Sequence, residues 1–576
     1  MSIRSALGRS PDEGPGTRTL GGVELAGPGW LSLLALALVA GGVVCWAVGA
    51  GLVAMWLFTL GAAAVALVLP FPLALVSPLF MGILGWLVDM LPFVVLAGWA
   101  AAVGRWAFGL LRQRRLPTGG KWILIPIGLV VWTAIGVSAI DLAEWKHFLL
   151  LFGIQVLASG AVLAAVDSLG DLESRIQVIG GVLLFIVLLT VAVVLQYAGI
   201  SLQDLQDESV SARAEAAYGL DAFPNDVGMV KYTRARNAGA YDLRVKVKKL
   251  QKRESGLPDH QVFIPISGAY GGVNLLVRFE GSARPYEDEL NDLGINLVFD
   301  GVGIAPASTV PRFRSFPRNP LTYAGICAAL FPFAFFLAWN GEGRRRLLGS
   351  IAIAACLVGA GFALARGAWV VIVIGGLYLV VDGRISWKRK LQYFGAVVAG
   401  AVLLTAVFLV KYDTDPMTAR AGAKGSVTTR EDLYRDTVSS VSGRHLITGY
   451  GTTKSRTSAG TNYARIGKYI PQAGTHSTYL NYLFRVGVPG AVGILALYLI
   501  AGLHARARAR SSDGAERSFS TLAAAAVVIV GAHGLILSLY VEPIYTLTIS
   551  LIIGIAIAGA LNLSTSVWPW RTRATA

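Results

Sequence analysis

The chain has 576 residues, of which 55% are hydrophobic and only 15% are charged, and its formal net charge is +16. A soluble globular protein is excluded, because apolar runs of about eighteen or more residues recur and each can cross a hydrocarbon core of roughly 30 Å. Nucleic acid is not an expected partner, because the basic residues cluster in short loops between apolar runs. The three cysteines, Cys45, Cys327 and Cys356, all lie within apolar runs, which leaves no disulfide framework or cysteine metal site.

Two long polar segments divide the apolar runs into three groups. In chain order the expected units are a polar cytoplasmic N-terminus at 1–28, an N-terminal transmembrane bundle at 29–198, a polar segment at 199–320, transmembrane helices at 321–410, a second polar segment at 411–477, and C-terminal helices with a cytoplasmic tail at 478–576. No cleavable signal peptide is evident in the first unit, which is rich in glycine and proline.

The expected fold class is an all-α polytopic membrane protein with about 12–14 transmembrane helices, since the apolar runs lack the alternation of barrel strands. Prolines interrupt the first four runs and Asp89 adds a charge, so two of these runs are alternatively half-spans or re-entrant segments. The predicted spans are 29–48, 50–69, 73–90, 91–111, 121–140, 146–166, 176–198, 321–339, 347–364, 367–381, 392–410, 478–502, 519–540 and 544–562.

Lysine and arginine in the short loops predict the orientation. If the spans alternate, one side of the membrane receives the clusters 112–115, 344–346, 384–390 and 506–510 together with Arg571 and Arg573. By the positive-inside rule that side is the cytoplasm, so both termini are expected there. The two long polar segments then lie outside.

The segment 199–320 is too long for a plain loop and is expected to fold on its own. Stretches such as Val262–Ile266 and Val273–Phe279 favour strands, and glycine and aspartate between them favour turns. The sequence therefore predicts a small, inserted β-rich extracytoplasmic domain. A module that contacts glycan and a structural cap are both consistent with it.

The second polar segment has an asymmetric charge. No acidic residue occurs from Thr437 to Ser512, whereas the outer part of this stretch contains five cations. These are Arg444, Lys454, Arg456, Arg465 and Lys468. They indicate either a site for an anionic group at the membrane surface or a solvated loop that contacts anionic lipid headgroups.

Arg366 lies between two apolar runs that almost no loop separates. A charge at that depth is costly unless it is paired or faces water, which makes a functional role the first hypothesis. Snorkelling to the headgroups is the alternative. A guanidinium suits diphosphate, because its planar fork stays charged and binds two oxygens at once.

His476 begins the span that follows the basic loop. An imidazole titrates near neutral pH and is therefore a candidate general base, although a histidine at a helix start is often a cap or interface residue. The other histidines, His147, His260, His445, His504 and His533, have unremarkable settings. Asp413 and Asp415 form a DxD pattern, but neither polar segment has a histidine–cysteine cluster, so no metal site is expected.

Four stretches together resemble the O-antigen ligase and polymerase superfamily of bacterial inner-membrane glycosyltransferases. They are Arg318–Gly325, Ala365–Ala368, Arg430–Gly451 and Thr475–Gly490. They are similar in turn to an Asn-Pro-Asn opening, a Ser-Arg-Gly-Ala turn, an Arg-x3-Trp followed by Pro-Leu-x-Gly-x-Gly, and a His-Asn-x-Tyr-Leu followed by glycines. The chain departs from these patterns at Leu321, Ala365, Tyr434, Leu446 and Ser477.

The resemblance implies a fold similar to the GT-C class and a reaction that needs neither metal nor cofactor. A glycan on undecaprenyl diphosphate would be transferred to the hydroxyl of a glycan, lipid or protein acceptor on the periplasmic face. His476 would be the base, and Arg366 and Arg430 would hold the diphosphate. The remaining residues expected to bind substrate are Arg318, Arg444, Arg465 and Tyr479.

Ligase and polymerase both fit the resemblance. A transporter or flippase of lipid-linked glycan is the alternative from another functional class, and it should have paired ionisable groups near the middle of its spans. Apart from Arg485, the middle regions are nearly free of charge, which favours an enzyme. Membrane lipids are expected partners, and the bacterial inner membrane is the expected location.

Overall fold

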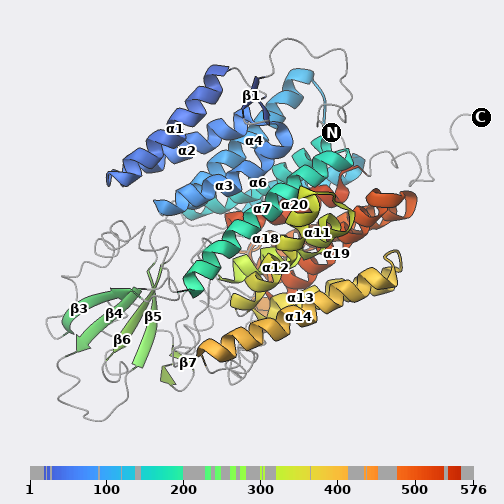
Figure 1. The fold of residues 1–576 in the computed structure, drawn as a ribbon. Coiled ribbons are helices and arrows are strands. Elements are labelled where there is room, and N and C mark those ends of the chain that lie inside the picture. Colours follow the sequence, from blue (N-terminus) through green and yellow to red (C-terminus); the bar gives the residue numbers. More distant parts are fainter. Residues whose placement is uncertain are drawn as a thin grey trace, which may run out of the picture.

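The computed structural model describes most of the apolar segments and part of the polar ones. The described residues are 18–20, 23–25, 29–88, 91–117, 120–136, 145–198, 227–234, 241–247, 260–266, 273–279, 299–300, 303–304, 320–363, 365–412, 434–435, 437–451, 477–537 and 542–559. Within them, each of the fourteen predicted spans forms an α-helix (Figure 1). The expectation of an all-α polytopic membrane protein is confirmed.

The helices are named as in Figure 1. The first group contains α1 (Gly29–Ala47), α2 (Gly51–Val68), α3 (Phe71–Leu87), α4 (Leu91–Gln113), the 3-10 helix η2 (Gly120–Ile123), α5 (Leu124–Ile135), α6 (Trp145–Ser168) and α7 (Leu172–Tyr197). The second group contains α11 (Pro320–Asn340), α12 (Arg344–Phe362), α13 (Arg366–Asp382), α14 (Trp387–Tyr412), α16 (His445–Thr448), α18 (Thr478–Ser511), α19 (Gly514–Ile536) and α20 (Pro543–Ile557).

Ten of the described helices are long and apolar enough to cross a membrane, which is fewer than the predicted 12–14. The other predicted spans are α3, α5, α13 and α20, with 17, 12, 17 and 15 residues. A helix rises about 1.5 Å per residue, so these four are shorter than a hydrocarbon core. Proline sets the start of two of them, because Pro72 and Pro543 occupy first-turn positions where no backbone N–H is needed.

Helix α11 lies at the centre of the bundle. Of its apolar window 89% is buried, compared with 11% for α1 and 22% for α14. The rings of Phe331 and Tyr393 lie 4.9 Å apart, and Phe336 and Phe519 lie 5.0 Å apart, so aromatic packing joins α11 to α14 and α19. Helices α1 and α14 are peripheral, and their exposed leucines and valines suit contact with lipid.

The described residues between 227 and 304 form six short strands. Strands β3 (Val227–Arg234), β4 (Tyr241–Val247), β5 (His260–Ile266) and β6 (Val273–Phe279) form one sheet, and β7 (Phe299–Asp300) pairs with β8 (Gly303–Ile304).

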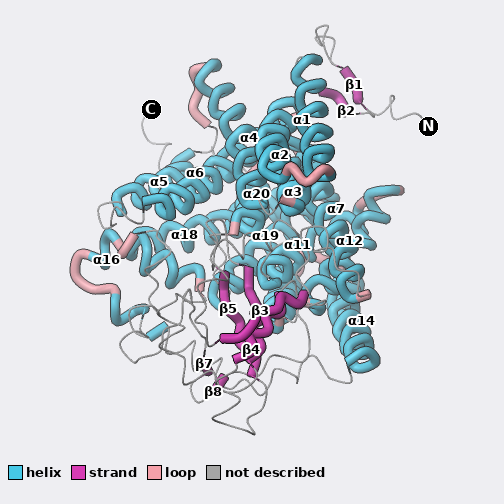
Figure 2. Tube along the Cα trace, turned by 90° about the vertical axis from the view of Figure 1, so that its left-hand side faces the viewer, coloured by secondary structure: helices cyan, strands magenta, loops and turns pink. Residues whose placement is uncertain are grey.

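The order in the four-stranded sheet is β3-β4-β6-β5, and only the β4–β6 pair is parallel. Both views place this sheet at one end of the bundle (Figures 1 and 2). The rest of 199–320 lies outside the described residues, so the inserted β-rich domain stays a prediction. A separate hairpin joins β1 (Arg18–Leu20) to β2 (Val23–Leu25).

Ion pairs join the ends of several helices at the other end of the bundle, which we call the basic end. The pairs that define it are Arg115–Asp167, Arg345–Glu173 and Arg506–Asp382. They bring the C-terminal ends of α4, α6, α13 and α18 together with the N-terminal ends of α7 and α12. The basic loops therefore lie at one end, as the alternation of spans predicts.

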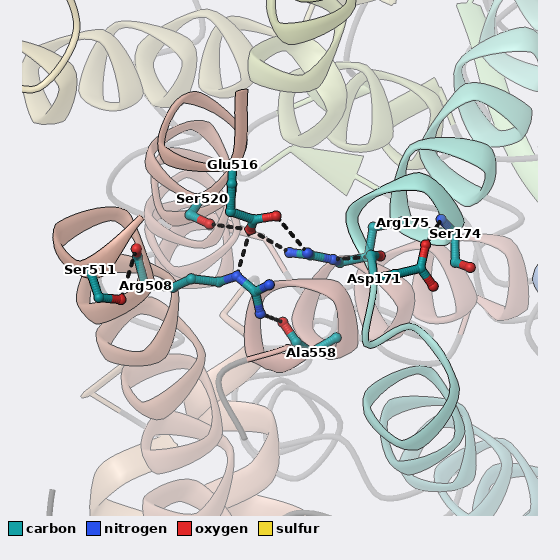
Figure 3. A network of polar contacts seen from close by, with 8 residues as sticks. All are labelled: Asp171, Ser174, Arg175, Arg508, Ser511, Glu516, Ser520 and Ala558. Atoms are coloured by element: carbon teal, nitrogen blue, oxygen red, sulfur yellow. Dashed lines mark hydrogen bonds and ion pairs between the residues drawn. The ribbon is translucent and has the colours of Figure 1, made fainter. Parts of the chain in front are cut away.

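A buried charge network adds to the basic end (Figure 3). The side chain of Arg175 on α7 is 1% exposed and donates two hydrogen bonds, of 2.9 and 2.8 Å, to the carboxylate of Glu516 on α19. Arg508 on α18 donates to the same carboxylate and, over 2.9 Å, to the carbonyl of Ala558 after α20. A buried charge is tolerated only when it is paired, so this network fixes four helices relative to one another.

Candidate active site

The last turn of α19 is the meeting point of segments that are far apart in the sequence. The hydroxyl of Tyr434 donates to the carbonyl of Leu535 over 2.9 Å. The hydroxyl of Thr478, the first residue of α18, donates to the carbonyl of Leu537 over 3.0 Å. Ser477 donates to the carbonyl of Gly534 over 3.3 Å. The last carbonyls of a helix lack N–H partners within the helix, and the hydroxyls of these side chains donate to them instead.

The turn that begins α13 packs against the same place. A Cβ on Gly367 would lie 2.6 Å from Cδ1 of Ile536, so the backbone of α13 and the last turn of α19 are in close contact. Arg366 directly precedes this glycine, is the first residue of α13, and is exposed. We call this region, defined by Arg366, Tyr434, Ser477 and Leu537, the loop end.

The structure describes only some of the predicted site residues. Arg366, Arg444 and Tyr479 are described, whereas Arg318, Arg430, Arg465 and His476 lie outside the described residues. Their neighbours are informative, however. Ser477 follows His476 directly, and Tyr434 follows Arg430 by four residues.

Arg444 and Tyr479 have different settings. Arg444 is exposed and directly precedes α16. Tyr479 is half-buried in the first turn of α18, and its hydroxyl donates to the carbonyl of Gly531 over 2.8 Å. That bond directs the hydroxyl of Tyr479 toward the backbone of α19.

Helix α18 is broken a little more than two turns from its start. Gly487 has φ +77° and ψ −174°, and Pro489 follows two residues later. Proline has no N–H to offer the carbonyl of Arg485, and the break removes the helical partner of the carbonyl of Phe484. The amides of Tyr450 and Gly451 replace them, at 2.8 Å from Phe484 and 3.0 Å from Arg485.

The glycines of this junction are required by backbone contact. Gly449 has φ +65°, and a Cβ there would overlap the backbone of Arg485. A Cβ on Gly487 would overlap the carbonyl of Ile447. The sequence Gly449-Tyr450-Gly451 thus serves to let the loop lie directly on the broken helix, and this explains the motif in structural terms.

An aromatic stack supports the junction. The ring of Tyr450 lies between His445, whose centroid is 3.9 Å away at an interplanar angle of 11°, and Phe484, at 4.7 Å and 23°. Nδ1 of His445 lies 2.9 Å from the carbonyl of Gly449, so this nitrogen carries the proton in that bond. No special role was expected for His445 from the sequence, and in the structure its ring packs on Tyr450.

Two further features belong to the loop end. A cavity of about 490 Å³ is lined by Tyr434, Arg435, Val438 and Ser439. The indole of Trp132 on α5 donates to the carbonyl of Ile447 over 2.8 Å, which ties α5 to α16. Because Tyr434 both lines the cavity and binds the carbonyl of Leu535, the cavity lies beside the last turn of α19.

The described residues contain no cluster of three or more histidine, cysteine or acidic residues that could hold a metal ion. Asp413 and Asp415 lie outside the described residues. Independence from metal is therefore still a prediction from the resemblance.

Comparison with known families bears on the region that forms the loop end. Residues 351–495, which are 145 of the 576, match the family model described as O-antigen ligase. Over these residues the chain is similar to the O-antigen ligase family. The expected resemblance is thus confirmed, and no curated protein matches the chain.

The O-antigen ligase match includes most of the predicted site. It runs from α12 through the second polar segment to the middle of α18, past the break at Gly487. Arg366, Arg430, Arg444, Arg465, His476 and Tyr479 lie within it, and Arg318 lies outside. The α18 junction therefore lies within the residues that match the family model. The last turn of α19, by contrast, lies beyond the match.

The meeting point on α19 was not found from the sequence. Its one local signal is the pair Gly531 and Gly534, three residues apart on one face of a helix that is otherwise rich in alanine and valine. A Cβ on Gly534 would lie 3.3 Å from Cε2 of Tyr479, so this glycine allows α18 to approach.

Proposed function

We propose that this O-antigen ligase family protein transfers a glycan from undecaprenyl diphosphate to an acceptor hydroxyl. The family implies a glycosyltransferase-type enzyme in a membrane. One observation supports the finer assignment to these residues. Gly367, Tyr434 and Ser477, which are close in sequence to Arg366, Arg430 and His476, all contact the last turn of α19.

The proposed reaction is a single displacement at the anomeric carbon. His476 accepts the proton of the acceptor hydroxyl as its oxygen bonds to that carbon. The bond between the carbon and the diphosphate oxygen breaks at the same time, and the diphosphate keeps the electron pair. His476 then releases the proton to water.

The two arginines act on the leaving group. Negative charge grows on the diphosphate as the sugar departs, and cations placed in advance stabilise that charge in the transition state. Arg366 and Arg430 are assigned this role. Because a diphosphate is already a good leaving group, neither a general acid nor a metal ion is required in the proposal.

The orientation follows from charge. The basic end is assigned to the cytoplasm and the loop end to the periplasm of a bacterial inner membrane, with both termini cytoplasmic. In this arrangement the segment containing β3–β6 is periplasmic, and a fold similar to the GT-C class is proposed. The β-rich segment either contacts glycan or caps the bundle.

The decisive experiment uses purified protein with a defined lipid-linked oligosaccharide and a soluble acceptor. We expect His476→Ala to lower the rate of transfer about a hundredfold to ten-thousandfold, as the loss of a general base does. His504→Ala is the matched control, because His504 lies on α18 toward the basic end, far from the loop end.

The mass of the product separates the remaining alternatives. A ladder of products indicates a polymerase, and a single addition indicates a ligase. Transfer by His476→Ala at the wild-type rate would remove the base from the proposal. Labelled donor that crosses reconstituted membranes without forming a new bond would establish a flippase instead.

A further inference from the structure

The basic end contains a cluster in which cationic side chains outnumber the acidic side chains paired with them. It lies where α13 ends, α14 begins and α18 ends, and we call it the α13–α14 basic patch. It consists of Arg384, Lys388, Arg389, Lys390 and Arg506. The only carboxylate paired with these five residues within the described chain is that of Asp382.

That carboxylate is enclosed. The side chain of Asp382 is 1% exposed. Its Oδ1 atom accepts hydrogen bonds from Arg384 and, over 3.4 Å, from the hydroxyl of Tyr378, and it lies 3.6 Å from Nε of Arg506. The negative charge is thus buried beneath the arginines, whereas the side chain of Arg506 is 44% exposed. An anion at the surface would meet the cations first.

The arginines retain hydrogen-bond donors. A guanidinium has five N–H groups. Arg384 uses one nitrogen for Asp382, and Arg506 approaches Asp382 only at ion-pair distance through Nε. Lys388 is exposed and contributes a further ammonium from the first turn of α14. The paired N–H groups of a guanidinium match the oxygens of a phosphate.

Three other arginines of the basic end pair with carboxylates. Arg345 pairs with Glu173, and the buried Arg175 and Arg508 share Glu516, so each of these three arginines has a carboxylate partner. In the patch two arginines share one carboxylate, and the lysines of α14 have none among the described residues. At the α13–α14 turn the charge of the lysines therefore adds to that of the two arginines.

The setting of α14 identifies the source of the anion. Only 22% of its apolar window is buried, and Leu391, Val398 and Val402 are exposed, so this helix faces lipid along its length. Trp387, its first residue, is 64% exposed, as is typical of an aromatic residue at the level of the headgroups. The amides of the first helical turn also favour an anion.

We propose that the α13–α14 basic patch binds the phosphate of an anionic phospholipid in the leaflet at the basic end. Arg384, Arg506 and Lys388 hold the phosphate oxygens, and the lipid's chains lie along the exposed face of α14. The site lies at the opposite end of the bundle from the loop end and is independent of the proposed glycan transfer. Basic surfaces of this kind between membrane helices suit anionic headgroups.

The test measures lipid retention by native mass spectrometry on the full-length protein in detergent. Phosphatidylglycerol and phosphatidylcholine are titrated separately. Wild-type protein is expected to retain phosphatidylglycerol in preference to phosphatidylcholine. The triple variant Arg384→Gln, Lys388→Gln, Arg506→Gln is expected to bind phosphatidylglycerol about tenfold or more weakly, because each cation near an anionic lipid contributes to its binding.

A matched control removes the same charge from the same end. Arg112, Arg344 and Arg346 are exposed at the basic end, and their combined replacement by glutamine is expected to leave phosphatidylglycerol retention unchanged. Because the triple variant also removes the partners of Asp382, the single variant Lys388→Gln provides a test without a broken ion pair. It is expected to weaken retention about threefold.

Three results would overturn the proposal. The first is unchanged retention in Lys388→Gln and in any folded triple variant. The second is equal retention of phosphatidylcholine, which would mean that the headgroup charge is irrelevant. The third is displacement of the lipid by inorganic phosphate in the same titration, which would show a site for a soluble anion.

Discussion

The two ends of the bundle are held together by different interactions. At the basic end charged side chains pair across helices, as when Arg175 and Arg508 share Glu516. At the loop end neutral donors bind the carbonyls of helix ends. The hydroxyls of Tyr434 and Thr478 do so on α19, and backbone amides do so on α18.

Because of this difference, the arginines of the two ends should contribute to different properties of the protein. The bonds that join the last turn of α19 to its neighbours use hydroxyls, so an arginine beside that turn is not needed for those bonds. At the basic end the arginines are themselves the links between helices. We therefore expect arginine substitutions to lower stability at the basic end and to lower activity at the loop end.

The largest effect is expected for Arg175→Ala. The substitution leaves the carboxylate of Glu516 with Arg508 as its one cationic partner among the described residues, beside the hydroxyl of Ser520, and removes the contact of Arg175 with the ring of Phe519, 5.2 Å away. Loss of one partner from a buried ion pair costs about 3–5 kcal/mol, so the free energy of unfolding should fall by that amount. Thermal denaturation in detergent measures it.

The matched control is Arg345→Ala. Arg345 also pairs with an acidic residue at the basic end, but its side chain and that of Glu173 are each 49% exposed. An exposed pair contributes about 1 kcal/mol or less, so the melting temperature should change little. Equal losses in both variants would contradict the role given to burial.

Arg366→Ala is expected to lower the rate of glycan transfer rather than the stability. If Arg366 stabilises the charge that grows on the diphosphate, its loss should lower the rate of glycan transfer about a hundredfold to a thousandfold, as the removal of one preorganised donor does. The melting temperature should stay close to that of the wild type, because Arg366 is exposed.

Arg344 provides the control for this variant. It is also the first residue of its helix and also exposed, but α12 begins at the basic end. Arg344→Ala should transfer glycan at the wild-type rate. Arg366→Lys keeps the charge without the planar fork, and a partial recovery of the rate would show that the fork itself contributes. Full activity in Arg366→Ala would end its assigned role.

Gly487→Ala tests the junction on α18. A residue with a Cβ is strained at φ +77°, and this Cβ would also overlap the carbonyl of Ile447. The expected loss of unfolding free energy is about 2–3 kcal/mol, with a lower rate of transfer because the junction lies beside the site. Thermal denaturation and the transfer assay, run on the same preparation, measure both.

Gly502→Ala is the control on the same helix. A Cβ there would lie 3.7 Å from Val527, which is ordinary contact, and alanine favours a helix interior by up to about 1 kcal/mol over glycine. This variant should be as stable as the wild type or slightly more stable. A similar loss in both variants would mean that α18 tolerates no change and that the break has no special role.

The helices were predictable because the apolar runs are long. Each predicted span became a helix, since a backbone in lipid must satisfy its own hydrogen bonds. The exact ends were less predictable. Windows such as 121–140 and 544–562 extended beyond α5 and α20, because apolar composition alone does not show where Gly136 or Ala558 ends a helix.

The site was predictable only in part, for a different physical reason. Charge at an unusual depth pointed to Arg366, and the resemblance to the O-antigen ligase pattern pointed to Gly449–Gly451. The last turn of α19 could not be found in the same way, because its contribution is made by the backbone carbonyls of Gly534, Leu535 and Leu537. Every residue has a carbonyl, so a sequence does not show which of them receive a distant hydroxyl.

The smallest effect is expected for Tyr434→Phe, and it distinguishes positioning from stability at the loop end. The variant loses one hydrogen bond to the carbonyl of Leu535 and should lower the free energy of unfolding by about 0.5–1.5 kcal/mol. Tyr450→Phe is the control, because its hydroxyl also donates to a carbonyl, that of Ser440, over 2.8 Å. The two variants should therefore lose similar stability.

Their activities should differ. The bond of Tyr434 joins the segment that follows Arg430 to α19, whereas that of Tyr450 lies within the 437–451 segment. We expect Tyr434→Phe to lower the rate of glycan transfer several-fold, because misplacement of a catalytic group by a fraction of an ångström is costly, and Tyr450→Phe to lower it less. Equal rates in the two variants, measured with the same lipid-linked donor, would mean that the Tyr434–Leu535 bond does not position Arg430.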